Sequence, residues 1–157
     1  MGLWSRLGKG AARVRQAIRP RVDDAFVAVE GVESAGALIR AIDAAMPRGA
    51  SLWIDFPGDE AVELFLAERT GRTVKRAGAS YLLPIAGDNL KMLARLVDGG
   101  KPAKIGMHMG VEHERRKLLT AYDLDSGVTE VGLSGRLPDS SRRTFIRIAT
   151  GEAPRPA

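Results

Sequence analysis

Residues 50–56 of the 157-residue chain read ASLWIDF, the stretch that most clearly indicates how this sequence folds. The stretch is short and apolar, and it lies between Gly49 and the pair Pro57–Gly58. Glycine and proline are typical of turns, and a short apolar run between turns is typical of a buried β-strand. We therefore place a strand at 50–56 and extend the analysis outward on both sides of it.

Helices and strands alternate around this strand. The expected order is a strand over 25–30, a helix over 34–46, the strand over 50–56, a helix over 59–71, a strand over 79–84 and a helix over 88–99. Glu33 and Ser34 open the first helix, and Asp59 and Asp88 can cap the next two by accepting a hydrogen bond from a free backbone N–H group. Within each helix, the apolar residues recur at helical spacing.

From Lys104 onward the period of the apolar residues changes to two. Ile105, Met107, Met109 and Val111 occupy alternate positions, which is typical of a strand with one buried face. Further strands are predicted over 118–124, 128–133 and 144–149, with a turn at Asp125–Gly127 between the first two. The second half of the chain therefore indicates strands that follow one another without intervening helices.

The expected fold class is α/β (or α+β). Alternating strands and helices favour a sheet with parallel parts, and hairpin-linked strands extend such a sheet. We predict a mixed β-sheet with three helices, in the order β-α-β-α-β-α-β-β-β. One domain is expected over residues 22–150, preceded by a basic amphipathic arm over 1–21 and followed by a disordered tail over 151–157.

The positive charge of this chain is concentrated in its first 21 residues. They hold six of the 24 Lys and Arg residues and no acid, so the remaining 18 basic and 19 acidic side chains leave the rest at −1. The chain has no Cys, which fits a cytoplasmic protein, and no apolar run is long enough to span a membrane. Only 5% of the residues are aromatic, which argues against nucleic acid as a partner.

Residues 3–18 would be amphipathic as a helix. Leu3, Leu7, Val14 and Ile18 would share one apolar stripe with Trp4 at its edge, and Arg6, Lys9 and Arg13 would lie on the other side. Such a segment can dock peripherally on an anionic membrane surface or on a partner protein. It can equally pack on the rest of the chain or be disordered. The predicted docking residues are Leu3, Trp4, Arg6, Leu7, Lys9, Arg13, Val14 and Ile18.

The candidate residues for chemistry are few. His108 and Glu112 would share one face of a strand, with only Gly110 between them, and could serve as an acid/base pair or as two metal ligands. Asp55, at the end of the strand over 50–56, and Asp59, at the next helix start, could add a carboxylate. The same residues also suit ordinary structural roles. No third metal ligand is apparent, so no metal or cofactor site is predicted.

Two functions are compatible with these patterns. The first is a non-catalytic binding or adaptor protein that recognises a protein partner or a small ligand and docks through its basic arm. The second is a small metal-assisted hydrolase or transferase that uses His108 and Glu112 with Asp55 or Asp59. No complete catalytic motif supports the second function, and we expect the first.

Overall fold

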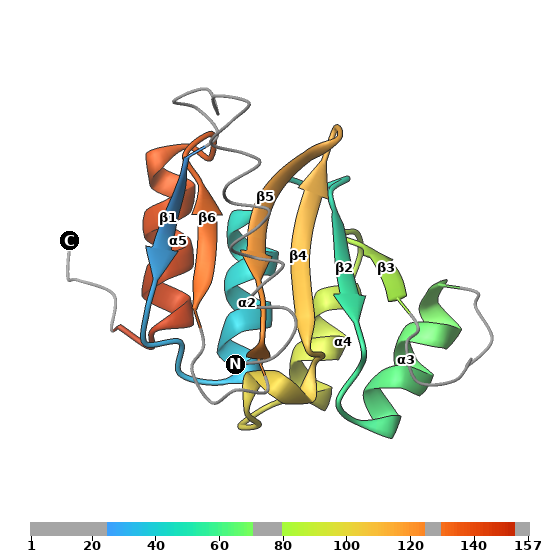
Figure 1. The fold of residues 1–157 in the computed structure, drawn as a ribbon. Helices are drawn as coiled ribbons and strands as arrows, with labels where there is room; N and C mark the ends of the chain where they lie inside the picture. The colour runs from blue at the N-terminus through green and yellow to red at the C-terminus, as the bar shows by residue number, and fades with distance from the viewer. Residues whose placement is uncertain (1–24, 71–79, 125–129, 153–157) are drawn as a thin grey trace.

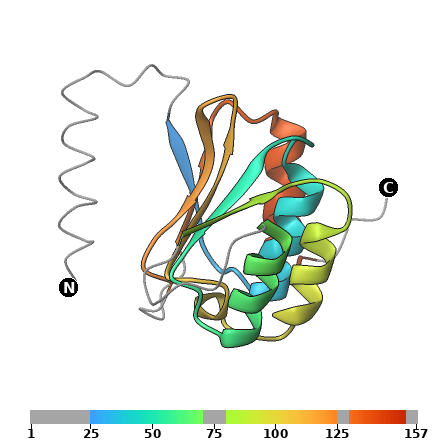
Figure 2. The ribbon, with the colours of Figure 1, turned by 90° about the vertical axis from the view of Figure 1, so that its right-hand side faces the viewer.

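A computed structural model describes residues 25–70, 80–124 and 130–152, which form a six-stranded sheet with helices against one of its faces (Figures 1 and 2). The elements are β1 (Phe26–Val29), α2 (Ala35–Ala45), β2 (Ser51–Asp55), α3 (Glu60–Thr70), β3 (Ser80–Pro84), α4 (Asn89–Leu96), the 3₁₀ turn η2 (Pro102–Lys104), β4 (His108–His113), β5 (Arg116–Ala121), β6 (Val131–Ser134) and α5 (Asp139–Ala149). The predicted α/β class is confirmed, and β2 lies where ASLWIDF placed it.

The sheet is antiparallel throughout the described residues, and the prediction of a mixed sheet was wrong. Its strand order is β1-β6-β5-β4-β2-β3, and every neighbouring pair runs antiparallel. The helix-linked strands β1 and β2 do point the same way, as do β3 and β4, because an even number of antiparallel steps separates them. However, β6, β5 and β4 lie between the first pair, and β2 lies between the second. These two pairs are therefore not adjacent, and the third helix-linked pair, β2 and β3, is adjacent but antiparallel.

The predicted strand over 144–149 is instead the second half of helix α5, so the described chain has four α-helices where three were expected. The β-branched residues at 144, 146 and 148 favoured a strand locally. Helix α5 begins earlier, at Asp139, and buries Phe145 and Ala149, which are four residues apart on one helical face. Its contact with α2 outweighs the local preference for a strand.

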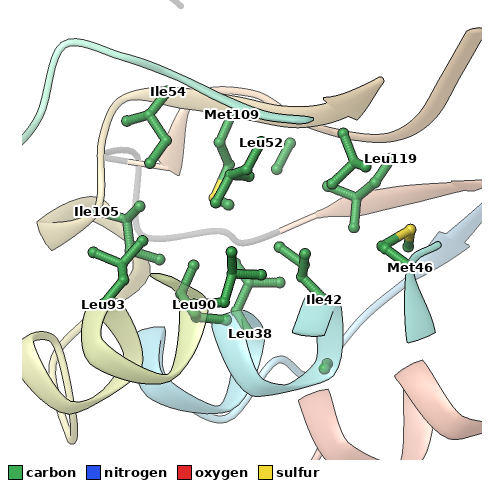
Figure 3. Packing of buried hydrophobic residues seen from close by; sticks show 14 of the residues in the cluster. Leu38, Ile42, Met46, Leu52, Ile54, Leu90, Leu93, Ile105, Met109 and Leu119 are labelled. Atoms are coloured by element: carbon green, nitrogen blue, oxygen red, sulfur yellow. The ribbon is translucent and has the colours of Figure 1, made fainter. Parts of the chain in front are cut away.

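The core lies between the helices and the sheet. Helix α2 contacts both α4 and α5, and the helices cover only one side of the sheet (Figure 2). Figure 3 shows apolar side chains of the helices facing those of the strands. The fully buried members include Leu38 and Ile42 of α2, Leu90 and Leu93 of α4, Leu52 and Ile54 of β2, Met109 of β4 and Leu119 of β5. This two-layer arrangement leaves the second face of the sheet without a helix in the described residues.

Several predicted segments lie outside the residues that the structure describes. The predicted basic arm at 1–21 lies outside the described residues, as do the turn at 125–127 and residues 153–157 of the predicted tail. The first two tail residues are described: the N–H groups of Gly151 and Glu152 donate to the carbonyls of Ile148 and Arg147 at the end of α5. Among the described helices, none has the length and apolar character needed to cross a bilayer.

Candidate binding site on the open face of the sheet

The face of the sheet opposite the helices, called the open face below, is built by alternation along the strands. In β2, Leu52 and Ile54 point into the core, so Ser51, Trp53 and Asp55 point the other way. Residues opposite one another on neighbouring strands share a face. The strand register therefore places on the open face Ser80, Leu82, His108, Gly110, Glu112, Lys117, Thr120 and Gly132.

The Trp53 indole packs against Gly110 on the open face. The two residues are register partners on β2 and β4. A Cβ atom added to Gly110 would come 2.4 Å from Cζ2 of the Trp53 indole and 2.5 Å from the backbone oxygen of Leu119. Any side chain at this position would push the indole off the strand. Gly110, which lies between His108 and Glu112 in the sequence, therefore leaves the space that the Trp53 ring occupies.

Aromatic rings gather around Trp53. The ring centroids of Trp53 and Tyr122 are 6.3 Å apart, and those of Tyr122 and His108 are 5.7 Å apart. Phe56 meets His108 edge to face at 6.3 Å. Tyr122 is 44% exposed and Phe56 37% exposed, although both are large hydrophobic side chains. A chain with few aromatic residues thus keeps several of them together at one end of the open face.

Next to these rings is a hollow of about 360 Å³, within the size range of small-ligand sites. It is lined by Trp53, Asp55, Ser80, Glu112, Lys117 and Tyr122. The Ser80 hydroxyl donates a hydrogen bond to the Asp55 carboxylate, which holds that side chain in place. Glu112 and Lys117 are register partners beside a β-bulge, where the pairing of β4 and β5 shifts by one residue. The hollow thus combines two aromatic rings with two carboxylates and one ammonium group.

Three of the four predicted catalytic candidates lie on the open face. Asp55 and Glu112 line the hollow, and Asp55 is the register partner of His108. His108 does not line the hollow, and it is only 1% exposed rather than on the open polar surface that we expected. Phe56 and Tyr122 cover it, and its Nδ1 accepts a hydrogen bond from the backbone N–H of Asp123 at 3.1 Å.

Asp59 lies apart from this group. Its carboxylate accepts hydrogen bonds from the backbone N–H groups of Ala61 and Val62, the helix-capping role that its position suggested. It also lies 3.9 Å from the Lys104 ammonium group. It does not line the hollow that contains Asp55. In the described residues, no three His, Asp or Glu side chains are placed to hold a metal ion together.

Several residues of the hollow were missed by the sequence analysis. Trp53 was assigned to the strand without asking which face it occupies, although Ser51, Trp53 and Asp55 alternate with the apolar residues of the same strand. That alternation was a usable signal. Ser80, Lys117 and Tyr122 carried no such signal, because only the strand order brings them beside Trp53. The predicted docking residues of the arm lie outside the described residues and are not placed.

Comparison with known proteins shows a partial similarity. No family model matches the chain, and no solved structure matches it. Among curated proteins, the chain is 33% identical over 147 residues to an aminomethyltransferase from Xanthomonas axonopodis pv. citri (strain 306). The match covers 89% of this chain, yet the chain spans only about two fifths of the relative, 39% of its length. This relationship is a similarity to part of that protein.

Proposed function

We propose that this chain is a non-catalytic binding protein whose open face holds a partner molecule, while its basic arm docks on an anionic membrane surface or a partner protein. The observation that carries the proposal is the aromatic hollow on a sheet face that no described helix covers. Aromatic side chains that stay exposed beside a concave polar surface are typical of recognition sites. The arm contributes six cations and no acid.

The hollow favours a ligand or side chain that carries a positive charge. Its two carboxylates, Asp55 and Glu112, outnumber the single ammonium of Lys117. The faces of Trp and Tyr rings also attract cations, by about 0.5–2 kcal/mol for each contact. The partner that fits is therefore an organic cation, either free or as the Lys or Arg side chain of a protein.

The geometry supports the catalytic alternative less well. His108, its proposed acid or base, is 1% exposed and lies under two aromatic rings, out of reach of a substrate in the hollow. Asp59, one of the two proposed extra carboxylates, caps α3 away from the hollow. The printed name of the relative concerns that whole protein, most of which this chain does not span.

The hollow can be tested with choline as the probe. We expect choline to shift the indole N–H resonance of Trp53 in the NMR spectrum of the full chain, with binding in the millimolar range. Replacing Tyr122 with leucine or Glu112 with glutamine should weaken binding about three- to tenfold, because each removes an attraction for the cation.

Two controls make this test specific. The neutral isostere 3,3-dimethylbutan-1-ol has the shape of choline without its charge and should bind more weakly. Glu114→Gln makes the same chemical change as E112Q at an 83%-exposed side chain that does not line the hollow, and it should bind choline like the wild type. Equal binding of choline and its isostere would contradict the cation preference. Absence of any shift at Trp53 with either probe would contradict the proposed site.

The role of the arm can be tested by vesicle flotation. We expect the full chain to float with vesicles of phosphatidylserine and phosphatidylcholine but not with phosphatidylcholine alone, because each cation near an anionic surface contributes about 1 kcal/mol. Leu7→Asp combined with V14D should abolish flotation by placing two charges in the apolar stripe. The matched control, Ser5→Asp with A12D, adds the same charges on the opposite side of the predicted helix. Equal loss in both double variants would contradict docking through the stripe.

A further inference from the structure

We propose that residues 3–18 of this chain cover its own open face when no partner is bound, with the apolar stripe of the arm packed across the strands. The inference rests on the proposed binding role of the open face and names the molecule that occupies it first.

The open face carries large apolar side chains that remain in contact with water. Leu82 is 52% exposed and Tyr122 44% exposed, and Trp53 lies between them on the neighbouring strand, partly exposed. Burying such side chains contributes about 25 cal/mol for each Å² removed from water. Leu3, Leu7, Val14 and Ile18 form the only apolar stripe that the sequence analysis predicted outside the described residues. The stripe and the open face could therefore each supply an apolar surface to the other.

The arm joins the sheet beside the open face. The described chain enters the fold at Ala25 and begins β1, an edge strand, at Phe26. Phe26 lies on the open face, because a Cβ atom on Gly132 would come 3.3 Å from its ring. Seven residues, 19–25, connect the stripe to Phe26, and a chain of that length reaches at most about 23–25 Å. The connection is long enough for the arm to turn back over the sheet.

The length of the arm matches the width of the sheet. Sixteen helical residues extend about 24 Å. Six strands separated by about 4.8 Å also span about 24 Å from β1 to β3. An arm that starts near β1 with Ile18 therefore brings Val14 over β6 and β5 and Leu3 near β3. In that position the N-terminal half of the arm passes over the hollow.

The charges favour this arrangement as well. The arm is purely cationic, and the described hollow carries two carboxylates against one ammonium group. The opposite net charges of the arm and the hollow attract each other, while the stripe that faces the sheet leaves Arg6, Lys9 and Arg13 on the outer side of the arm. Attachment to the same chain gives the arm an effective concentration near the millimolar range, so even weak binding covers the face.

The test uses disulfide formation in the full chain, which has no cysteine of its own. One variant carries Leu3→Cys with L82C and another carries Val14→Cys with T120C, the pairs that the proposed path brings together. The control carries Leu3→Cys with R143C, which is exposed on α5 on the other side of the sheet. Under dilute oxidising conditions, we expect both test pairs to form intramolecular disulfides at least tenfold faster than the control pair.

Three results would overturn the inference. Equal rates in the test and control pairs would show an arm with no preferred position. A faster control pair would place the arm on the helical side. Disulfide-linked dimers in place of linked monomers would assign the face to the arm of a second copy.

The choline titration separates this inference from the proposed function. Choline binding with slow disulfide formation removes the inference and leaves the binding role in place. Fast disulfide formation in the test pairs, together with no choline binding in the variant Leu7→Asp with V14D, whose stripe no longer packs on the face, removes the proposed cation site and shows that the face serves only the arm.

Discussion

Replacing Phe145 with alanine is expected to lower the free energy of unfolding by about 3–5 kcal/mol, the range for truncating a buried phenylalanine. Phe145 is fully buried on α5, where this helix packs against α2. The truncation removes the transfer free energy of the ring and leaves a cavity between two helices that cannot close completely. Urea unfolding followed by circular dichroism measures the loss through the shift of the midpoint.

The control for this variant is Arg143→Ala, two residues away on the exposed side of the same helix. It should change stability by less than about 0.5 kcal/mol, as surface substitutions usually do. A loss of less than about 1 kcal/mol in F145A would contradict the packing of α5 on the core. Such a result would favour the strand that the sequence analysis predicted over 144–149.

Replacing Gly110 with alanine is expected to lower the free energy of unfolding by about 2–3 kcal/mol, although alanine is small and apolar. The new methyl group would meet the Trp53 indole on one side and the Leu119 backbone oxygen on the other, both well inside contact distance. The indole can tilt away, but the neighbouring strand cannot. Thermal and urea unfolding measure the loss, and the Trp53 indole N–H resonance should shift as the ring leaves its seat.

Two further variants separate the two clashes at Gly110. In a Trp53→Ala background the cost of G110A should fall without disappearing, because the Leu119 oxygen remains; the difference is the coupling energy between the two positions. Gly132→Ala is the matched control on the same face, since its nearest neighbour, the Thr120 hydroxyl, is 3.0 Å away and can rotate. Equal losses in G110A and G132A would contradict a special fit between Trp53 and Gly110.

The sequence predicted the elements of this fold better than their arrangement. Apolar spacing located the strands and helices up to residue 121, because one face of each element is buried and its period is visible. Helix α5 was missed because its β-branched residues favour a strand and only its contact with α2 decides otherwise. Strand direction was wrong because other strands lie between two of the helix-linked pairs and the third pair, β2 and β3, runs antiparallel; no local pattern records either feature.

Only those site residues that show a polar side chain within a recognisable strand pattern could be predicted from the sequence. Asp55 and Glu112 were recognised as strand residues with polar side chains, and both line the hollow. His108 was expected on an open surface, but two rings from other segments cover it. Tyr122 and Lys117 join the site through strand order and a β-bulge, which depend on long-range pairing. Residues that only the strand order brings together cannot be identified from local sequence patterns.

The pairing of β1 with β6 has a consequence for synthesis on the ribosome. Phe26 pairs with Ser134, so the first strand of the sheet has no partner until almost the whole chain has been made. Contacts between such distant residues carry a large entropic cost and slow folding. In the nascent chain β1 therefore stays unpaired while β2, β3 and β4 can already pair. A chaperone that recognises apolar strands could bind β1 until β6 has been made.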